Sequence, residues 1–231
     1  MTTTLITGAN KGLGREAARR LVQAGHDVYL GARDSERGAA AARELGCRFV
    51  VLDVLDDDSV TAAAAAVEAE SGTLDVLVNN AGINGGAVPA EDTTAEDVER
   101  VYATNVLGVV RVTHAFLPLL LRSPAPAIVN VSSGLGSLAV TTDPTLPWSA
   151  WRGLAYPSSK AALNMLTSQY AKSFPQIRIN AVDPGYTATD LNGHGGTQSV
   201  EEGAEAIVAM ASIGPDGPTG GFFDRHGVVP W

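Results

Sequence analysis

The chain of 231 residues contains a single cysteine, Cys47. An intrachain disulfide and a cysteine-rich metal site are therefore excluded, and we expect Cys47 to be a buried or inert thiol. Basic residues are also in short supply, since 16 Lys and Arg stand against 25 Asp and Glu, a formal net charge of −9. This acidic balance argues against nucleic acid or anionic membrane surfaces as partners, although it leaves room for a local basic pocket.

Long hydrophobic runs are missing as well. The run from Phe116 to Leu121 is too short to span a bilayer. No basic region followed by a long apolar segment stands at the amino terminus, so we expect no secretory signal and a cytoplasmic protein. The four histidines are scattered along the chain, and we therefore expect no metal site.

What the sequence does contain is an alternation of short apolar runs with longer helical patterns. The predicted strands are Thr3–Thr7, Asp27–Gly31, Arg48–Leu52, Val76–Asn79, Ala127–Ser132, Arg178–Val182 and Gly221–Phe223. The predicted helices are Leu13–Ala24, Glu36–Leu45, Ser59–Glu70, Ala95–Leu121, Ser158–Phe174 and Val200–Ala211. Such alternation predicts an α/β doubly wound Rossmann fold, with one mostly parallel sheet of about seven strands and helices on both faces. We expect one domain over residues 1–231, because no repeat or linker divides the chain.

A glycine-rich turn follows the first predicted strand and opens the first predicted helix. Gly8, Gly12 and Gly14 permit a tight turn and a close approach of the backbone to a pyrophosphate. The helix amino terminus then offers free N–H groups and the positive end of its dipole to that anion. The segment lacks the Gly-Lys-Ser/Thr ending of a nucleoside-triphosphate loop, so it predicts dinucleotide binding rather than a kinase or GTPase.

The end of the second predicted strand bears on which dinucleotide binds. Enzymes that use NAD place an acid there for the ribose 2′-hydroxyl, whereas this chain has Ala32 followed by Arg33. A guanidinium suits a 2′-phosphate, and Lys11 and Arg37 can add positive charge. We therefore expect NADP(H), although the neighbouring Asp34 and the possibility of ordinary solvated charges leave NAD(H) open.

The segment Tyr156-Pro-Ser-Ser-Lys160 carries the predicted chemistry. Residues four apart share a helix face, so the Lys160 ammonium can approach the Tyr156 phenol. A nearby cation and a helix amino terminus both favour the phenolate, so we expect a lowered pKa for Tyr156. Ser132 and Ser133 end a predicted buried strand, where ligands bind in such sheets. Asn105 lies inside an apolar helical stretch and needs a polar partner if it is buried.

These motifs together resemble the short-chain dehydrogenase/reductase family, most closely its carbonyl reductase-like members. Asp53, the segment from Asn79 to Gly82, and Pro184-Gly185 also match that pattern. The resemblance implies that Tyr156 is the general acid and base, that Lys160 binds the nicotinamide ribose, and that Ser133 rather than Ser132 orients the carbonyl. It further implies that Asn105 supports a proton relay toward Lys160. The predicted cofactor-binding residues are Gly8, Asn10, Lys11, Gly12, Leu13, Gly14, Arg33, Arg37, Asp53, Val54, Asn79, Ala81, Gly82, Tyr156, Lys160, Pro184, Gly185 and Thr187.

The predicted function is hydride transfer between NADP(H) and a small aldehyde, ketone or alcohol. The alternatives are a regulator or scaffold that senses NADP without turnover, and a dehydrogenase of sugar, steroid or acyl-thioester substrates. One departure from the family concerns the 23 positions between Ser133 and Tyr156, which include an insertion with Trp148 and Trp151. These tryptophans either line the substrate pocket or belong to a surface flap. In relatives with long insertions this segment covers an oligomer surface, so a homo-oligomer is possible here and subunit number stays open.

Overall fold

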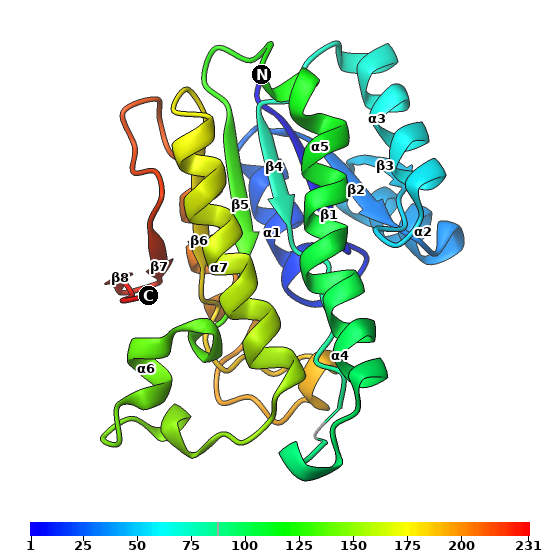
Figure 1. Ribbon diagram of the computed structural model, residues 1–231. Coiled ribbons are helices and arrows are strands. Elements are labelled where there is room, and N and C mark those ends of the chain that lie inside the picture. Colours follow the sequence, from blue (N-terminus) through cyan, green and yellow to red (C-terminus); the bar gives the residue numbers. More distant parts are fainter. Residues whose placement is uncertain (87) are drawn as a thin grey trace.

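The computed structural model describes residues 1–86 and 88–231, and within them eight strands form one sheet (Figure 1). The strands are β1 (Thr3–Thr7), β2 (Asp27–Ala32), β3 (Arg48–Val51), β4 (Val76–Asn79), β5 (Ala127–Val131), β6 (Arg178–Val182), β7 (Phe222–Asp224) and β8 (Gly227–Val228). Their order is β3-β2-β1-β4-β5-β6-β7-β8, and every pairing is parallel except that of β7 with β8. The predicted fold class is confirmed. The sequence did not predict β8, because a strand of two residues leaves no periodic signal.

The six predicted helical segments fall between the strands as expected, with small shifts at their ends, and the structure adds a short helix over Leu138–Thr142 that the sequence did not predict. The helices are α1 (Gly12–Gln23), α2 (Ser35–Leu45), α3 (Asp57–Ser71), α4 (Ala95–Tyr102), α5 (Gly108–Leu120), α6 (Leu138–Thr142), α7 (Ala155–Ser173), α8 (Val200–Gly203) and α9 (Glu205–Ala211). The helix predicted over Ala95–Leu121 is interrupted by a π-helical turn, η2 (Ala103–Leu107), and the one predicted over Val200–Ala211 divides into α8 and α9. Short 3₁₀ turns occupy η1 (Ala90–Asp92), η3 (Gly134–Gly136), η4 (Pro147–Ala150) and η5 (Asp190–Asn192).

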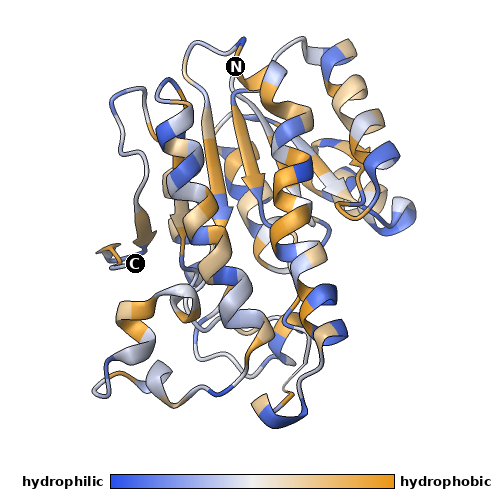
Figure 2. Ribbon diagram, in the orientation of Figure 1, coloured by the Kyte–Doolittle hydropathy of each residue, from blue (hydrophilic) through white to orange (hydrophobic). Residues whose placement is uncertain are grey.

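Side chains that alternate along each strand build two hydrophobic layers, one on each face of the sheet. Leu5 belongs to the layer under α3, α5 and α7, whereas its neighbour Ile6 belongs to the layer under α1, α2 and α9. This alternation follows from the period of two in a β-strand. In Figure 2 the central strands are apolar, while the helices carry polar residues on their outer sides. The helices of both layers therefore hold the sheet by their apolar sides.

The helical stretch Ala95–Leu120 is long and apolar enough to cross a membrane by length and composition alone. More than half of its most apolar window, 56%, is buried inside the protein. Val112, Phe116 and Leu119 of this stretch pack in the layer that covers β4 and β5. Packing against the sheet accounts for the apolar composition of this helix.

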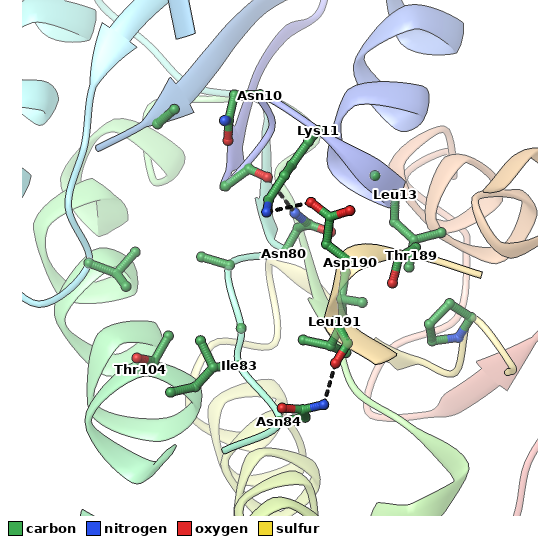
Figure 3. Close-up of a pocket in the computed structure, with 18 of the residues that line it drawn as sticks. Asn10, Lys11, Leu13, Asn80, Ile83, Asn84, Thr104, Thr189, Asp190 and Leu191 are labelled. Atoms are coloured by element: carbon green, nitrogen blue, oxygen red, sulfur yellow. Dashed lines mark hydrogen bonds and ion pairs between the residues drawn. The ribbon is translucent and has the colours of Figure 1, made fainter. Parts of the chain in front are cut away.

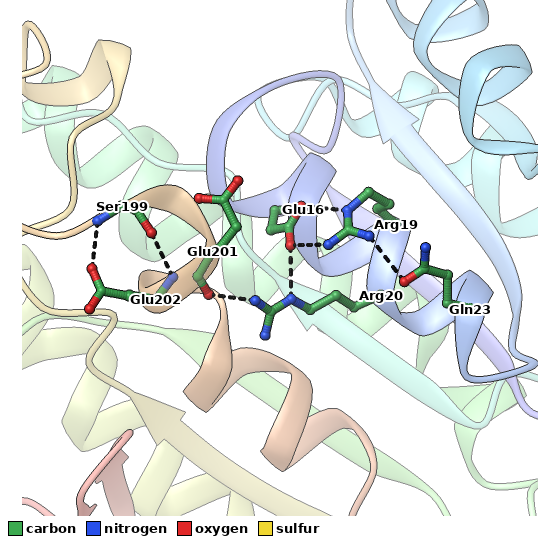
Figure 4. A network of polar contacts seen from close by, with 7 residues as sticks. All are labelled: Glu16, Arg19, Arg20, Gln23, Ser199, Glu201 and Glu202. Atoms are coloured by element: carbon green, nitrogen blue, oxygen red, sulfur yellow. Dashed lines mark hydrogen bonds and ion pairs between the residues drawn. The ribbon is translucent and has the colours of Figure 1, made fainter.

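A polar network ties the carboxyl-terminal helices to the first helix (Figure 4). The Glu16 carboxylate accepts hydrogen bonds from the guanidinium groups of Arg19 and Arg20. These hydrogen bonds hold the pKa of Glu16 below its usual range, and the one from Arg19 has the largest effect. Arg20 also donates to the Glu201 carbonyl oxygen at 2.9 Å, while Ser199 and Glu202 form a capping box at the start of α8. The loop that precedes α8 is thereby held beside α1.

Buried amides join neighbouring strands beneath α5 and α7. The Asn79 side chain of β4 donates to the Asn130 side chain of β5 at 2.9 Å. Asn130 in turn donates to the Thr167 hydroxyl of α7, also at 2.9 Å. All three side chains are buried, so their polar groups depend on one another for hydrogen bonds.

We predict that Asn130→Ala lowers the free energy of unfolding by about 2–3 kcal/mol, because it removes buried hydrogen bonds and leaves the Asn79 amide poorly paired. Denaturant unfolding followed by circular dichroism measures this change. Gln169→Ala on the exposed side of α7 is the control, with an expected change below about 0.5 kcal/mol. Equal destabilisation by the two variants would contradict the role assigned to the buried amides.

Candidate active site

A cavity of about 570 Å³ opens at the carboxyl ends of the central strands, where parallel sheets of this class bind their ligands (Figure 3). Of the predicted site residues, it is lined by Gly8, Asn10, Lys11, Gly12, Leu13, Arg33, Asp53, Val54, Ala81, Gly82, Tyr156, Lys160 and Pro184. The remaining predicted residues lie outside its wall, namely Gly14, Arg37, Asn79, Asn105, Ser133, Gly185 and Thr187. The tertiary structure therefore brings together residues from nearly the whole length of the chain.

The glycine-rich turn between β1 and α1 forms one wall of the cavity. Gly8 and Gly12 have left-handed φ angles of 63° and 55°, which other residues adopt with strain. A side chain at Gly14 would collide with the Asn80 amide, so Gly14 serves the packing of the turn. Because α1 begins at Gly12, its amino terminus and unpaired N–H groups are at the cavity. This wall suits an anionic group such as a pyrophosphate.

The basic residues after β2 separate into two kinds. Asp34 caps α2 by accepting from the Arg37 backbone N–H, and its carboxylate also pairs with the Arg37 guanidinium at 3.1 Å. Arg37 is therefore neutralised and does not line the cavity. Arg33 does line it, and across residues 1–86 and 88–231 no acidic side chain forms an ion pair with it. The cavity thus offers an exposed guanidinium, a group that suits a phosphate.

Asn79 ends β4 and Asn80 follows it, and their side chains face opposite sides of the strand. Asn79 turns into the core and donates to Asn130, so it supports the site only through the sheet. Asn80, which the sequence analysis did not select, lines the cavity and donates to the carbonyl oxygens of Thr7 and Gly8. The Thr7 hydroxyl accepts in return from the backbone N–H of Asn80. The alternation of side chains along a strand predicts that only one of two neighbours faces the site.

Helix α7 begins at Ala155 and presents Tyr156 and Lys160 on one side, as the spacing predicts. The Lys160 ammonium lies 5.5 Å from the centre of the Tyr156 ring and donates to the Val131 carbonyl oxygen at 2.7 Å. Burial lowers the pKa of Lys160 to about 8. Burial also raises the pKa of Tyr156 to about 12, an effect that a hydrogen bond with Ser133 reduces and the charge of Asp183 reinforces. The predicted lowering of the Tyr156 pKa is therefore wrong for this structure, because burial of the phenol is the largest influence on its pKa.

The two serines after β5 have different partners. Ser132 is buried and donates to the Asn164 side chain at 2.6 Å. The Ser133 hydroxyl accepts from the Leu135 N–H at 3.2 Å, and it also lowers the pKa of the Tyr156 phenol. Ser132 lines the cavity but its hydroxyl donates to Asn164, so Ser133 is the serine that acts on the phenol.

Asn105 lies in the π-helical turn η2, a type of distortion that is frequent at functional sites. Its amide donates to the Ile83 carbonyl oxygen and to the Ser159 hydroxyl, and its oxygen accepts from the Ile83 N–H. A Cβ atom at Gly82 would lie 3.3 Å from the Asn105 oxygen and 3.7 Å from the Lys160 nitrogen. The absence of a side chain at Gly82 thus leaves the approach from Asn105 to Lys160 open.

A second cavity, of about 320 Å³, adjoins the first. The two share Asn84 and Tyr156 in their walls. Its wall is largely apolar and includes Val88, Pro89, Ala150, Trp151, Leu154, Ala155 and Pro157. The insertion before Tyr156 thus contributes Trp151 to a cavity, whereas Trp148 packs edge-on against Tyr186 at 6.0 Å.

The segment after β6 closes part of the first cavity (Figure 3). The Lys11 ammonium pairs with the Asp190 carboxylate at 2.7 Å, and His194 contacts the other oxygen of the same carboxylate at 2.9 Å. The Asn84 amide donates to the Leu191 carbonyl oxygen. Asp190, Leu191 and His194 all line the cavity. The sequence analysis missed Asp190 and Asn84, because only the fold brings these loops together.

Gly185 and Thr187 lie at the start of this segment and shape it. Gly185 has a left-handed φ of 72° and donates its N–H to the Asp183 carboxylate at 2.9 Å. The Thr187 hydroxyl is buried and donates to the Pro184 carbonyl oxygen at 3.0 Å. Both residues hold the turn that presents Pro184 to the cavity.

Comparison with known proteins agrees with this architecture. Residues 2–199 match the family model described as short chain dehydrogenase. A short-chain dehydrogenase of Penicillium roqueforti is 41% identical, with 91% of this chain and 88% of the relative covered. The (+)-neomenthol dehydrogenase of Arabidopsis thaliana is 35% identical, with 97% of this chain and 96% of the relative covered.

Among solved structures, the NADPH-bound carbonyl reductase from chicken fatty liver superposes with a TM-score of 0.87 at 29% identity, covering 100% of this chain and 99% of that one. The salutaridine reductase of Papaver somniferum gives a TM-score of 0.84 at 30% identity, covering 96% of this chain and 99% of that one. With this match over most of its length, the chain belongs to the short-chain dehydrogenase/reductase family of oxidoreductases and is similar to its carbonyl reductases.

Proposed function

We propose that this protein is an NADP(H)-dependent reductase of aldehydes or ketones, with Tyr156 as its general acid. The observation that carries the proposal is the place of Tyr156 in the walls of both cavities. One cavity has the glycine-rich turn and Arg33, which suit a phosphorylated dinucleotide, and the other is largely apolar. Tyr156 therefore stands where a cofactor and a carbonyl substrate would meet.

The larger cavity fits the cofactor in size and in chemistry. Its volume of about 570 Å³ lies within the range of cofactor sites. In this proposal the helix α1 amino terminus holds the pyrophosphate, Arg33 holds the 2′-phosphate, and Asp53 lies near the adenine. When bound, NADPH supplies the hydride that carbonyl reduction requires. Known relatives support this choice, since the structural neighbours include an NADPH-bound carbonyl reductase and an NADP complex of a gluconate 5-dehydrogenase.

The protein groups would act as follows. Ser133 and Tyr156 donate hydrogen bonds to the carbonyl oxygen, and Tyr156 passes its proton to that oxygen as it becomes an alcohol. A pKa of about 12 keeps the phenol protonated at neutral pH, the state that reduction needs. Lys160 and Asn105 lie on the route by which the phenol regains its proton. The same groups run in the reverse direction when an alcohol is oxidised.

The second cavity is the proposed substrate side. Its largely apolar wall and its volume of about 320 Å³ suit a compact uncharged carbonyl compound. Relatives are named (+)-neomenthol dehydrogenase, (−)-isopiperitenone reductase and salutaridine reductase, which supports a small organic molecule as the substrate.

The variant Tyr156→Phe tests the proposed proton donor. We expect kcat for reduction to fall by roughly 10²–10⁴ because the proton donor is lost, while NADPH binding stays intact. Steady-state NADPH oxidation over a panel of aldehydes, ketones and quinones, with fluorescence titration of NADPH, measures both. Tyr170→Phe on the same helix is the matched control and should keep full activity. Tight NADPH binding by the unaltered protein without turnover of any substrate would favour the regulator or another substrate class.

The second prediction concerns the choice of cofactor. We expect Arg33→Ala to weaken NADPH binding roughly 10- to 100-fold and to leave NADH binding nearly unchanged, because charge-assisted hydrogen bonds to the 2′-phosphate are lost. Arg37→Ala is the matched control and should have little effect, because that guanidinium already pairs with Asp34. Fluorescence titrations of each variant with NADPH and with NADH measure the two dissociation constants. A preference of the unaltered protein for NADH would refute the cofactor assignment alone.

The third prediction concerns the substrate cavity. Trp151→Ala should lower kcat/KM for bulky cyclic ketones about tenfold or more, because the indole forms part of the apolar wall. For a small linear aldehyde, kcat/KM should change little. An equal loss for both substrates would show that Trp151 acts on the fold and not on substrate choice.

A further inference from the structure

Asp183 follows β6 and carries a buried carboxylate, although the residue as a whole is partly exposed. In the described part of the chain no basic side chain forms an ion pair with it. Its carboxylate accepts a hydrogen bond from the backbone N–H of Gly185 at 2.9 Å, and the N–H of Gly134 also acts on it and lowers its pKa. Burial of a carboxylate costs free energy unless hydrogen bonds compensate it. A buried carboxylate beside the reacting groups therefore points to a functional role.

The two N–H donors belong to turns on either side of the site. Gly134 follows Ser133, and Gly185 follows the cavity-lining Pro184. A Cβ atom at Gly134 would lie 2.8 Å from a carboxylate oxygen of Asp183, so a glycine there allows this close approach. The carboxylate therefore joins the turn that presents Ser133 to the turn that presents Pro184. An ionised carboxylate suits this place because both of its oxygens only accept hydrogen bonds.

The charge of Asp183 also reaches the reacting groups. It raises the pKa values of both Tyr156 and Lys160. Burial raises the pKa of Asp183 above its usual range, and the charge of Asp224 from β7 adds to this rise. The N–H groups of Gly185 and Gly134 and the charge of Lys160 from α7 lower it in part. Among the described residues, Asp183 is the one acid whose charge acts on both members of the Tyr156–Lys160 pair.

We propose that Asp183 is a positioning residue, which clamps the Ser133–Gly134 and Pro184–Gly185 turns together and whose negative charge sets the pH range in which Tyr156 and Lys160 work. This inference rests on the proposed function, since it assigns Asp183 a part in the same proton transfer. Asp183 acts through its neighbours and does not line either cavity.

The test is Asp183→Asn, assayed in the full chain with NADPH and a carbonyl substrate. The alkaline limb of the kcat/KM profile should move to lower pH by on the order of one unit, because loss of the negative charge lowers the pKa of Tyr156 and of Lys160 alike. The value of kcat should also fall, because the asparagine amide would point an N–H group at one of the two backbone donors. Asp183→Ser, a smaller neutral variant, should shift the profile in the same direction. It serves as the test if the Asp183→Asn protein does not fold.

Asp224→Asn is the matched control, because it removes a neighbouring acid that does not act on Tyr156 or Lys160. Because Asp224 also raises the pKa of Asp183, only the alkaline limb, where Asp183 is ionised in both proteins, should coincide with that of the unaltered protein. A second readout, the ultraviolet absorbance of the Tyr156 phenolate relative to the Tyr156→Phe protein, requires no turnover. If no carbonyl is reduced, the proposed function fails while this titration still tests Asp183. Neutral variants with an unshifted profile and an unshifted phenolate titration would overturn the proposal.

Discussion

Parallel strands cannot be joined by tight turns, and this constraint arranges the whole molecule. Each strand must be followed by a crossover on one face of the sheet, so all the strands in the central part end at the same edge. The sheet order reverses between β1 and β4, which leaves a crevice between the loops that follow them. The glycine-rich turn, Arg33, Asp53 and Asn80 come from different loops, yet they line one cavity for this reason.

Burial affects two kinds of polar side chain here, the amides inside the sheet and the ionisable groups at its carboxyl edge. In the sheet, a hydrogen bond from the Asn79 side chain to Asn130 joins β4 to β5, while the buried Asn79 oxygen has no partner among the described residues. At the carboxyl edge, burial acts on groups that can ionise, and it moves the pKa of Tyr156 up to about 12 and that of Lys160 down to about 8. Both shifts favour the neutral forms. Burial thus keeps Tyr156 as a neutral phenol and raises the free-energy cost of removing its proton.

The structure also separates residues that look alike in the sequence. Arg33 and Arg37 are four positions apart, but Asp34 pairs with Arg37 at the start of α2 and leaves Arg33 to the cavity. Ser132 and Ser133 are adjacent, but the Ser132 hydroxyl donates to Asn164, whereas Ser133 acts on the Tyr156 phenol and lowers its pKa. In each pair the local geometry of a strand end or a helix cap gives the two side chains different partners.

The sequence by itself determined the fold class, seven of the eight strands, the glycine-rich turn and the Tyr156–Lys160 pair, because all of these depend on local periodicity, glycine or helical spacing. It did not predict the π-helical turn at Asn105, the contact of Asp190 with Lys11, or the place of Asp183, because these depend on partners distant along the chain. The direction of the Tyr156 pKa shift was missed for a related reason. Spacing shows that a lysine is near, but only the tertiary structure decides how completely the phenol is removed from water.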